Sequence, residues 1–219
     1  GVQTCALPIF LEKRFLAEHA GTVPYAPIRD PESLARAQAA GLLPGILKRA
    51  RQGYDGKGQV RVNTGTELLK ALEALGGAPC VLERLAPLQG ELSVVLARDA
   101  HGATAVFPVA ENFHVDGILD LTVAPARVAP ALAATAVSTA TRIAHALDYQ
   151  GVLCVEFFVL ADGRLVANEI APRPHNSGHY TIDACECSQF EQQVRVLAGM
   201  PLGPSHMHGG AAMLNLLGD

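Results

Sequence analysis

Two β-prone runs joined by a tight turn constrain this sequence more than any other feature. The runs cover residues 152–159 and 164–170, and the dipeptide Asp162-Gly163 lies between them. Asp-Gly is the preferred central pair of a two-residue type I′ hairpin turn, whose backbone twist matches that of antiparallel strands. The sequence therefore predicts an antiparallel hairpin that is closed by a two-residue turn.

The predicted turn also fixes which residues face each other across the hairpin. If Ala161 opposes Arg164, stepping five residues outward along each strand brings Glu156 opposite Glu169. Opposed residues have Cβ atoms about 4.5–5.5 Å apart, and like charges there are destabilising. Two carboxylates that leave most coordination positions open suit Mg²⁺ that carries nucleotide phosphates. We therefore expect a metal site here; with a longer turn, the two glutamates would instead diverge into solvent.

Capping signals and β-prone runs predict the remaining elements. Helices are expected where capping residues or prolines precede helical sequence, over residues 30–41, 64–77, 130–147 and 188–199. Strands are expected at residues 45–48 and, as an antiparallel meander, at 80–84, 91–98 and 103–109. The predicted fold class is α+β.

A glycine-rich segment follows the expected strand at residues 45–48. Residues 53–58 read Gly-Tyr-Asp-Gly-Lys-Gly, and glycines let backbone N–H groups approach an anion closely. The segment lacks the Gly-Lys-Ser/Thr ending of a P-loop, so by itself it fits a phosphate cradle and an ordinary connection equally well. Lys48 precedes the segment and is either a phosphate ligand or a solvated surface lysine.

A dense set of polar side chains follows Glu169, where residues 173–179 read Arg-Pro-His-Asn-Ser-Gly-His. Arginine holds carboxylate or bicarbonate through two parallel charge-assisted hydrogen bonds, so the run predicts a site for a small planar anion. The alternative is a structural loop in which Asn176 and Ser177 cap the backbone. A zinc site is a weaker alternative, because no standard zinc motif matches the spacing of His175, His179, His206 and His208.

Composition and charge exclude several classes of function. A net charge of −4 argues against a dedicated nucleic-acid binder, which needs a basic face. The sequence has no apolar run of about eighteen residues and no basic-then-apolar leader, so we expect a cytoplasmic protein that does not enter membranes. The five cysteines are odd in number and irregularly spaced, which favours reduced thiols. The expected partners are small molecules or proteins.

Taken together, these motifs resemble the N(5)-carboxyaminoimidazole ribonucleotide synthetases, a family of ATP-grasp ligases. The resemblance rests on Lys48, the loop at 53–59, Glu83, Gly-Glu-Leu-Ser at 90–93, Glu-Asn-Phe-His at 111–114, Glu156 and residues 168–179. It extends from about residue 11 to the end of the chain. Residues 168–179 and 188–191 resemble that family rather than ATP-grasp enzymes in general.

The resemblance implies an ATP-grasp fold, which is α+β with two subdomains whose antiparallel sheets enclose the nucleotide. Residues 11–82 would form the small subdomain with a preceding linker helix, and residues 83–219 would form the large subdomain with the metal site. Residues 1–10 resemble nothing in the family and stay unassigned. The family's N-terminal domain and closing segment are also not found in this sequence.

The implied reaction joins bicarbonate to 5-aminoimidazole ribonucleotide with hydrolysis of ATP, through carboxyphosphate, in purine biosynthesis. The implied cofactors are ATP and Mg²⁺, and family members are commonly homodimers. Two alternatives stay open. One is another ATP-grasp ligase, such as a formate-using glycinamide ribonucleotide transformylase or a biotin carboxylase, against which the tetrad at residues 175–178 speaks. The other is a nucleotide-binding fragment that is catalytically incomplete by itself; turnover by the isolated chain would separate the two.

The resemblance also implies roles for individual residues. ATP phosphates would be held by Lys48, Gly53, Tyr54, Asp55, Gly56, Lys57, Gly58 and Gln59. The adenine would lie beside a hinge of Glu83, Arg84 and Leu85, with Glu91 at the ribose and His114 and Asn168 completing the nucleotide site. Glu156 and Glu169 would bind Mg²⁺, in agreement with the hairpin register. Tyr54, Asp55 and Lys57 would touch the ribonucleotide, and Arg173, His175, Asn176 and Ser177 would surround bicarbonate. Arg173 and Lys48 would be catalytic.

Overall fold

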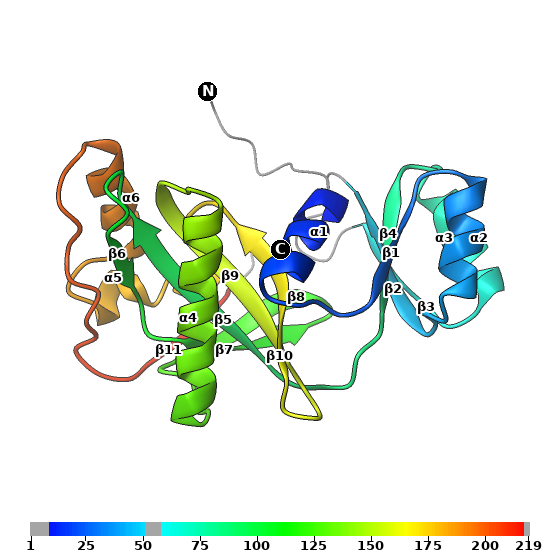
Figure 1. Cartoon of the computed structure of the whole chain (residues 1–219). Helices are drawn as coiled ribbons and strands as arrows, with labels where there is room; N and C mark the ends of the chain where they lie inside the picture. The colour runs from blue at the N-terminus through cyan, green and yellow to red at the C-terminus, as the bar shows by residue number, and fades with distance from the viewer. Residues whose placement is uncertain (1–8, 51–57, 217–219) are drawn as a thin grey trace. The chain divides into compact units, whose positions relative to one another are not determined.

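The computed structural model describes residues 9–50 and 58–216, and the chain divides into two compact units (Figure 1). The first unit is Gly1–Pro87 and the second is Leu88–Asp219. The boundary that the resemblance implies, between residues 82 and 83, falls inside a strand of the first unit, β4 (Cys80–Arg84). In the described residues, no helix has the length and apolar character needed to cross a membrane.

In its described residues, the first unit consists of a four-stranded antiparallel sheet and three helices. The strand order is β1 (Tyr25–Ile28), β4, β2 (Gly45–Arg49) and β3 (Gln59–Val62). The helices are α1 (Ile9–His19), α2 (Pro31–Ala39) and α3 (Gly65–Ala74). Leu47, Leu68 and Leu82 are fully buried in the core, and they come from two strands and one helix.

The expected helix starts at residues 30 and 64 are confirmed, although the detail of the caps differs. Asp30 accepts a hydrogen bond from the backbone N–H of Ser33 at 2.7 Å, and the Ser33 hydroxyl completes a capping box. Thr64 likewise accepts from the N–H of Glu67 at 3.2 Å. The Glu67 carboxylate, however, bonds to the backbone N–H of Asn63, one residue before the expected partner.

The second unit is built on a seven-stranded antiparallel sheet. Its order is β10 (Leu165–Ala171), β9 (Gly151–Leu160), β5 (Leu88–Arg98), β7 (Ala110–Val115), β8 (Ile118–Ala124) and β11 (Ala211–Leu214), with β6 (Thr104–Val106) also paired to β5. The helices are α4 (Pro130–Ala146), α5 (Thr181–Ala184), α6 (Gln189–Leu197) and the short 3₁₀ helix η1 (Asn176–Gly178). The helices expected at residues 130–147 and 188–199 are therefore confirmed.

The predicted meander at residues 80–109 is wrong in one respect. β5 and β6 do pair as antiparallel neighbours, but β4 belongs to the sheet of the first unit. β4 lies between β1 and β2, so its backbone groups are already bonded on both edges. Neither edge of β4 is therefore free to pair with β5.

Side chains alternate between the two faces of the second sheet. Leu92, Val94 and Leu96 are buried on one face, which α4 covers. Val95 lies on the opposite face, in an apolar cluster with Tyr180 and other residues from the α5 region. Because Glu91 and Ser93 share the face of Val95, this second face carries polar groups at one end and an apolar core at the other.

Candidate functional site

The turn between β9 and β10 contains three residues, not the two that were predicted. The backbone N–H of Leu160 donates to the Arg164 carbonyl at 2.9 Å, and Val159 pairs with Leu165. Gly163 has a φ of +83° and donates to the Leu160 carbonyl, as expected at the last position of a three-residue loop. The longer loop shifts the strands by one residue from the predicted register.

A β-bulge at Asn168 reverses this shift. Ala167 pairs with Phe157, but the next ladder pair is Glu169 with Glu156, so Asn168 is the extra residue. The predicted opposition of the two glutamates is therefore confirmed, although the predicted turn is wrong. Without the bulge, Asn168 would take the position opposite Glu156.

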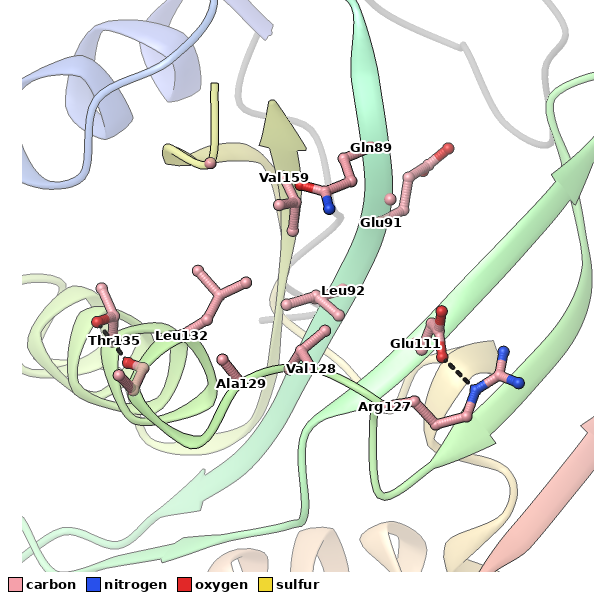
Figure 2. A pocket seen from close by; sticks show the side chains of 13 residues that line it. Gln89, Glu91, Leu92, Glu111, Arg127, Val128, Ala129, Leu132, Thr135 and Val159 are labelled. Atoms are coloured by element: carbon pink, nitrogen blue, oxygen red, sulfur yellow. Dashed lines mark hydrogen bonds and ion pairs between the residues drawn. The ribbon is translucent and has the colours of Figure 1, made fainter. Parts of the chain in front are cut away.

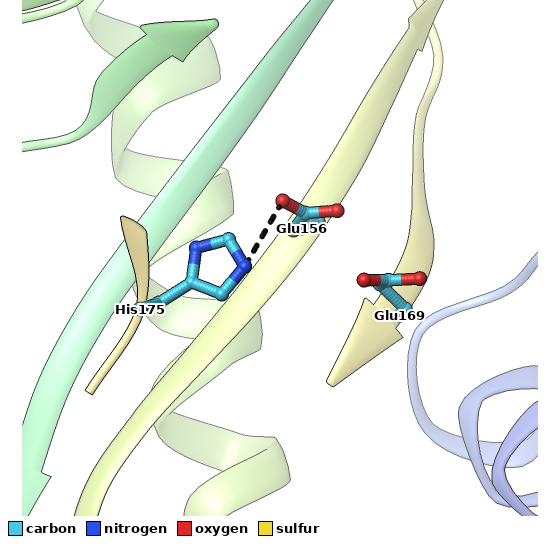
Figure 3. Close-up of side chains that lie close together, drawn as sticks. All are labelled: Glu156, Glu169 and His175. Atoms are coloured by element: carbon cyan, nitrogen blue, oxygen red, sulfur yellow. Dashed lines mark ion pairs between the residues drawn. The ribbon is translucent and has the colours of Figure 1, made fainter. Parts of the chain in front are cut away.

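Two glutamates and a histidine form a potential metal centre at this point of the sheet (Figure 3). One ligand atom from each of Glu156, Glu169 and His175 lies within 4.8 Å of the other two. The Nε2 atom of His175 is 3.5 Å from Oε1 of Glu156, and these side chains are only 11% and 13% exposed. Two carboxylates side by side with little solvent repel each other, and oxygen donors of this kind suit Mg²⁺. The two carboxylates therefore fit a divalent cation, with His175 beside them.

The imidazole of His175 is neutral at pH 7. Burial lowers its pKa to about 4, and the positive charge of Arg173 acts in the same direction. Its Nδ1 atom accepts a hydrogen bond from the backbone N–H of Ser177 at 3.3 Å and lies 2.9 Å from the Ser177 hydroxyl. We infer from these contacts that Nε2 carries the ring proton and presents it to Glu156. His175, which was predicted to surround bicarbonate, thus lies beside the metal-binding carboxylates.

The remaining polar residues of the 173–177 run differ in their surroundings. Arg173 is exposed, and its Nη1 donates to the Pro174 carbonyl at 2.9 Å. Ser177 is fully buried. The Oδ1 atom of Asn176 is buried and accepts no hydrogen bond within the described part of the chain. A buried acceptor of this kind is costly unless a ligand or water donates to it.

Ser93 is a further polar residue of this face; the sequence analysis placed it in the segment at 90–93 but gave it no role of its own. It pairs with Glu156 across β5 and β9, so Ser93, Glu156 and Glu169 form a row over three neighbouring strands. Its hydroxyl is buried and has no hydrogen-bond partner among the described residues. The alternation of side chains from Glu91 would have placed Ser93 on the same face.

Glu91 and His114 lie together on the same sheet. Oε2 of Glu91 is 3.1 Å from Nδ1 of His114, and both side chains are partly exposed. Glu91 was expected at the ribose, and His114 was expected to complete the nucleotide site. Asn168, expected in the same role, is buried in the bulge between the glutamate pair and the turn.

A separate charged cluster lies inside the first unit. Glu83 accepts ion pairs from two lysines, Lys13 through Oε1 at 3.0 Å and Lys48 through Oε2 at 3.1 Å. Lys13 is 0% exposed, and burial lowers its pKa against the opposing effect of Glu83. Burial alone would raise the pKa of Glu83, but Lys48 and Lys13 outweigh it, so this pKa lies below its usual value. These three side chains comprise two lysines and one glutamate, a combination that suits an anion.

Sequence reasoning assigned Lys48 but missed Lys13. Lys13 and Leu16 are the buried residues of α1, and their spacing of three places both on one face of the helix. A lysine on a buried stripe needs an anionic partner, and this position was the available signal. The side chain of Glu83, expected at the adenine hinge, is here bonded to both lysines.

The other residues predicted around the nucleotide are only partly described. Gly53, Tyr54, Asp55, Gly56 and Lys57 lie outside the described residues. Gln59 pairs with Lys48 across β2 and β3, and Gly58 has a φ of +79°. In the expected hinge, Arg84 donates to the Gly41 carbonyl at 2.7 Å, and the N–H of Leu85 donates to the Pro44 carbonyl at 2.9 Å.

A cavity of about 600 Å³ lies on the α4 side of the second sheet (Figure 2). Leu92, Val159 and Leu132 line it, and an ion pair of 2.8 Å between Arg127 and Glu111 lies in its wall. Since Leu92 and Ser93 point to opposite faces, this cavity is separate from the glutamate cluster. Its lining combines apolar side chains with Gln89, Glu91 and Thr135 and with the Arg127–Glu111 pair.

Comparison with known proteins agrees with these features. The family model of the ATP-grasp domain matches residues 13–190. An N5-carboxyaminoimidazole ribonucleotide synthase of Brucella melitensis is 48% identical over 213 residues, which are 96% of this chain and 59% of that protein. The synthase of Bacillus subtilis is 42% identical and aligns with 90% of this chain and 52% of its own length. The chain thus spans about half the length of the curated relatives it matches.

Solved structures of such enzymes have the same fold. An ADP complex of an N5-carboxyaminoimidazole ribonucleotide synthetase superposes with a TM-score of 0.89 at 41% identity, over 95% of this chain and 55% of that one. An Aspergillus clavatus N5-carboxyaminoimidazole synthase in complex with ADP and 5-aminoimidazole ribonucleotide gives a TM-score of 0.85 at 31% identity, over 96% and 56%. The fold predicted from the sequence is confirmed.

Proposed function

Because the chain belongs to the ATP-grasp family, we propose that it binds magnesium-ATP as part of an N(5)-carboxyaminoimidazole ribonucleotide synthetase. The reaction carboxylates 5-aminoimidazole ribonucleotide with bicarbonate and hydrolyses ATP to ADP and phosphate. The observation that carries the proposal is the opposed pair of Glu156 and Glu169 with His175 beside it. The similar Aspergillus clavatus enzyme was solved in complex with ADP and 5-aminoimidazole ribonucleotide, which supports the choice of substrates.

Each unit supplies one set of ATP-binding residues in this proposal. In the first unit, Lys48 and Lys13 bring two positive charges to a buried position beside Glu83. Lys48 attracts phosphate oxygens, with backbone N–H groups of the loop at 53–59 as further donors. In the second unit, Glu91 and His114 contact the nucleoside, and Asn168 completes the site.

Glu156 and Glu169 hold Mg²⁺. When bound, this ion neutralises charge on the ATP phosphates and orients the phosphoryl group that is transferred. The chain's own share is positional: the bulge at Asn168 brings both carboxylates to one face, and the strands keep them there. The neutral imidazole of His175 adds a proton donor next to Glu156 without adding a second positive charge.

Arg173, Asn176 and Ser177 surround bicarbonate, with His175 at the boundary to the metal site. Arg173 is exposed and carries the planar donor pair that bicarbonate needs, and the buried Oδ1 of Asn176 is ready to accept a hydrogen bond. Bound in this way, a bicarbonate oxygen attacks the γ-phosphorus of ATP, and the bond to ADP breaks. Carboxyphosphate then forms, and Lys48 and Arg173 stabilise the charge of this step as the catalytic residues.

The second half-reaction forms the new C–N bond. Carboxyphosphate releases phosphate and leaves carbon dioxide beside the substrate. The exocyclic amine of 5-aminoimidazole ribonucleotide attacks this carbon and gives up one proton. Tyr54, Asp55 and Lys57 are proposed to hold the ribonucleotide; they lie outside the described residues. A homodimeric state and a location in the cytoplasm complete the proposal.

Calorimetric titration of magnesium-ATP into the purified chain tests the proposal. The parent chain is expected to bind, and Glu169→Gln is expected to weaken binding by about tenfold or more, since charged contacts contribute roughly 1.5–3 kcal/mol. Glu111→Gln is the matched control, because Glu111 belongs to the same sheet but pairs with Arg127 in the cavity of Figure 2. Absence of binding to the parent, or equal weakening by both substitutions, would contradict the proposal.

A further inference from the structure

One side chain of α6 holds the main chain of His175 from both sides. Oε1 of Gln189 accepts a hydrogen bond from the backbone N–H of His175 at 2.9 Å, and Nε2 of Gln189 donates to the His175 carbonyl at 2.7 Å. Gln189 is 0% exposed, so water does not replace these bonds. The N–H lies before the Cα atom of His175 and the carbonyl lies after it. The two bonds therefore fix the point from which the imidazole extends.

Gln189 is itself anchored to the same loop. Its backbone N–H donates to the Thr181 hydroxyl at 3.0 Å, and that hydroxyl donates to the Gly178 carbonyl at 2.6 Å. The loop also approaches Gln189 closely, because a Cβ atom at position 178 would lie 2.6 Å from Oε1 of Gln189. The Gly178 N–H also donates to the His175 carbonyl at 2.9 Å, so a closed ring of hydrogen bonds joins His175, Gly178, Thr181 and Gln189.

We infer that Gln189 is a positioning residue for the metal centre. By holding the main chain of His175, Gln189 fixes the position of the imidazole relative to Glu156. An amide is suited to this position because it supplies a donor and an acceptor at once. Outer-shell groups that orient the residues around a metal typically change metal affinity by about 10–100-fold when they are replaced. The inference rests on the proposed function in one respect, namely that the cluster binds a divalent cation.

The same helix provides a matched control. Gln192, one turn further along α6, is also 0% exposed. It donates from Nε2 to the Gly203 carbonyl at 2.6 Å and accepts from the Gly203 N–H at 3.1 Å. Replacement of either glutamine by methionine keeps a side chain of similar length and removes two buried hydrogen bonds to one residue's main chain. Only Gln189 holds a residue of the metal centre.

The experiment compares the parent chain, Gln189→Met and Gln192→Met. Mn²⁺ without nucleotide is titrated into each and followed by electron paramagnetic resonance, with thermal unfolding measured in parallel. We expect Gln189→Met to weaken Mn²⁺ binding by about tenfold or more and Gln192→Met to leave it within about twofold. Both should lower the unfolding temperature to a similar extent. Equal weakening by both variants, or unchanged Mn²⁺ affinity in Gln189→Met, would overturn the inference.

A second readout separates this inference from the proposed function. Histidine-labelled chain gives the ring signals of His175 and the exchange rate of its backbone N–H without any metal. If the parent binds no Mn²⁺, the proposed metal site fails, and these signals decide the positioning role. They should move in Gln189→Met and stay in place in Gln192→Met; no difference between the variants would refute the role.

If Gln189→Met does not fold, Gly178→Ala serves the same purpose. The added methyl group would press on Oε1 of Gln189 and displace the amide without removing it. The same weakening of Mn²⁺ binding and the same change at His175 are expected. Retention of the parent's affinity and signals in this variant would contradict the inference.

Discussion

The two units each contain a cluster of buried charged side chains, and the clusters differ in how their charges are balanced. In the first unit, Glu83 lies between Lys13 and Lys48 and bonds to both. In the second unit, Glu156 and Glu169 oppose each other, and the nearby His175 is neutral at pH 7. The first cluster pairs its carboxylate with two lysines, whereas the second places two carboxylates opposite each other.

This difference shows how burial and ligand binding are linked. Desolvation penalises every one of these ions, and it is tolerated in the first cluster because opposite charges are about 3 Å apart. In the second cluster, two carboxylates oppose each other across β9 and β10, and like charges in such a pair are destabilising. Two lysines in one cluster and two carboxylates in the other are complementary to the phosphates and the cation of magnesium-ATP.

The largest effect is expected in the first unit. Glu83→Gln removes the carboxylate between two buried ammonium groups, so the free energy of unfolding should fall by about 3–5 kcal/mol. Urea denaturation at pH 7 measures this change. Glu73→Gln, at an exposed glutamate of α3 in the same unit, should change stability by less than about 0.5 kcal/mol. Similar effects of the two substitutions would contradict the picture of an internally balanced cluster.

The same cluster predicts a pH dependence with a definite sign. The pKa of Glu83 is below its usual 4.5 in the folded chain, so the unfolded chain takes up the proton first as the pH falls. The stabilisation by Glu83 is therefore fully present above pH 4.5 and is lost as the pH falls through the folded pKa. The stability difference between parent and Glu83→Gln should shrink from pH 7 to strongly acidic pH. A constant difference would show that the ion pairs contribute nothing.

A smaller effect is expected for phosphate binding. Lys48→Met leaves the ion pair of Lys13 with Glu83 and removes one of the two buried positive charges, so magnesium-ATP affinity should fall by roughly tenfold to a hundredfold. Isothermal titration calorimetry measures the change. Lys70→Met, at an exposed lysine of the same unit, is the control. If Lys48→Met and the parent bound magnesium-ATP with equal affinity, Lys48 would not be part of the ATP site.

The smallest effect should have the opposite sign. Glu169→Gln removes a like charge opposite Glu156, so the metal-free chain should become more stable by roughly 0.2–1 kcal/mol. Chelator-treated protein and urea denaturation test this. The same Glu→Gln substitution would thus destabilise the first cluster and stabilise the second. A loss of stability in Glu169→Gln would show that a group of the chain already balances this charge.

The sequence predicted the glutamate pair for an incomplete reason. The Asp162-Gly163 signal correctly identified the hairpin, but the turn contains one more residue than expected, and the bulge at Asn168 restores the pairing. A bulge has no strong local signature, because it depends on how neighbouring strands and the loop share twist. The longer turn and the bulge therefore cancel from Glu169 onward. Before the bulge they do not, because Ala167 pairs with Phe157 and not with the predicted residue 158.

Other features needed the tertiary structure. The N-caps at Asp30 and Thr64 depend on residues within one turn and were predictable. The sheet to which β4 belongs depends on partners from distant parts of the chain, and it was predicted wrongly. Lys13 and Gln189 are functional candidates only because of what they contact, Glu83 in one case and the main chain of His175 in the other. A single sequence shows neither contact.

The most direct measurement of the central claim is a crystal structure of the chain grown with Mn²⁺ and ADP, with anomalous scattering used to locate the metal. The account predicts an anomalous peak that is coordinated by carboxylate oxygens of both Glu156 and Glu169. Bound ADP with a metal that contacts neither glutamate would contradict the account. So would an ordered glutamate pair that carries no metal when Mn²⁺ is saturating.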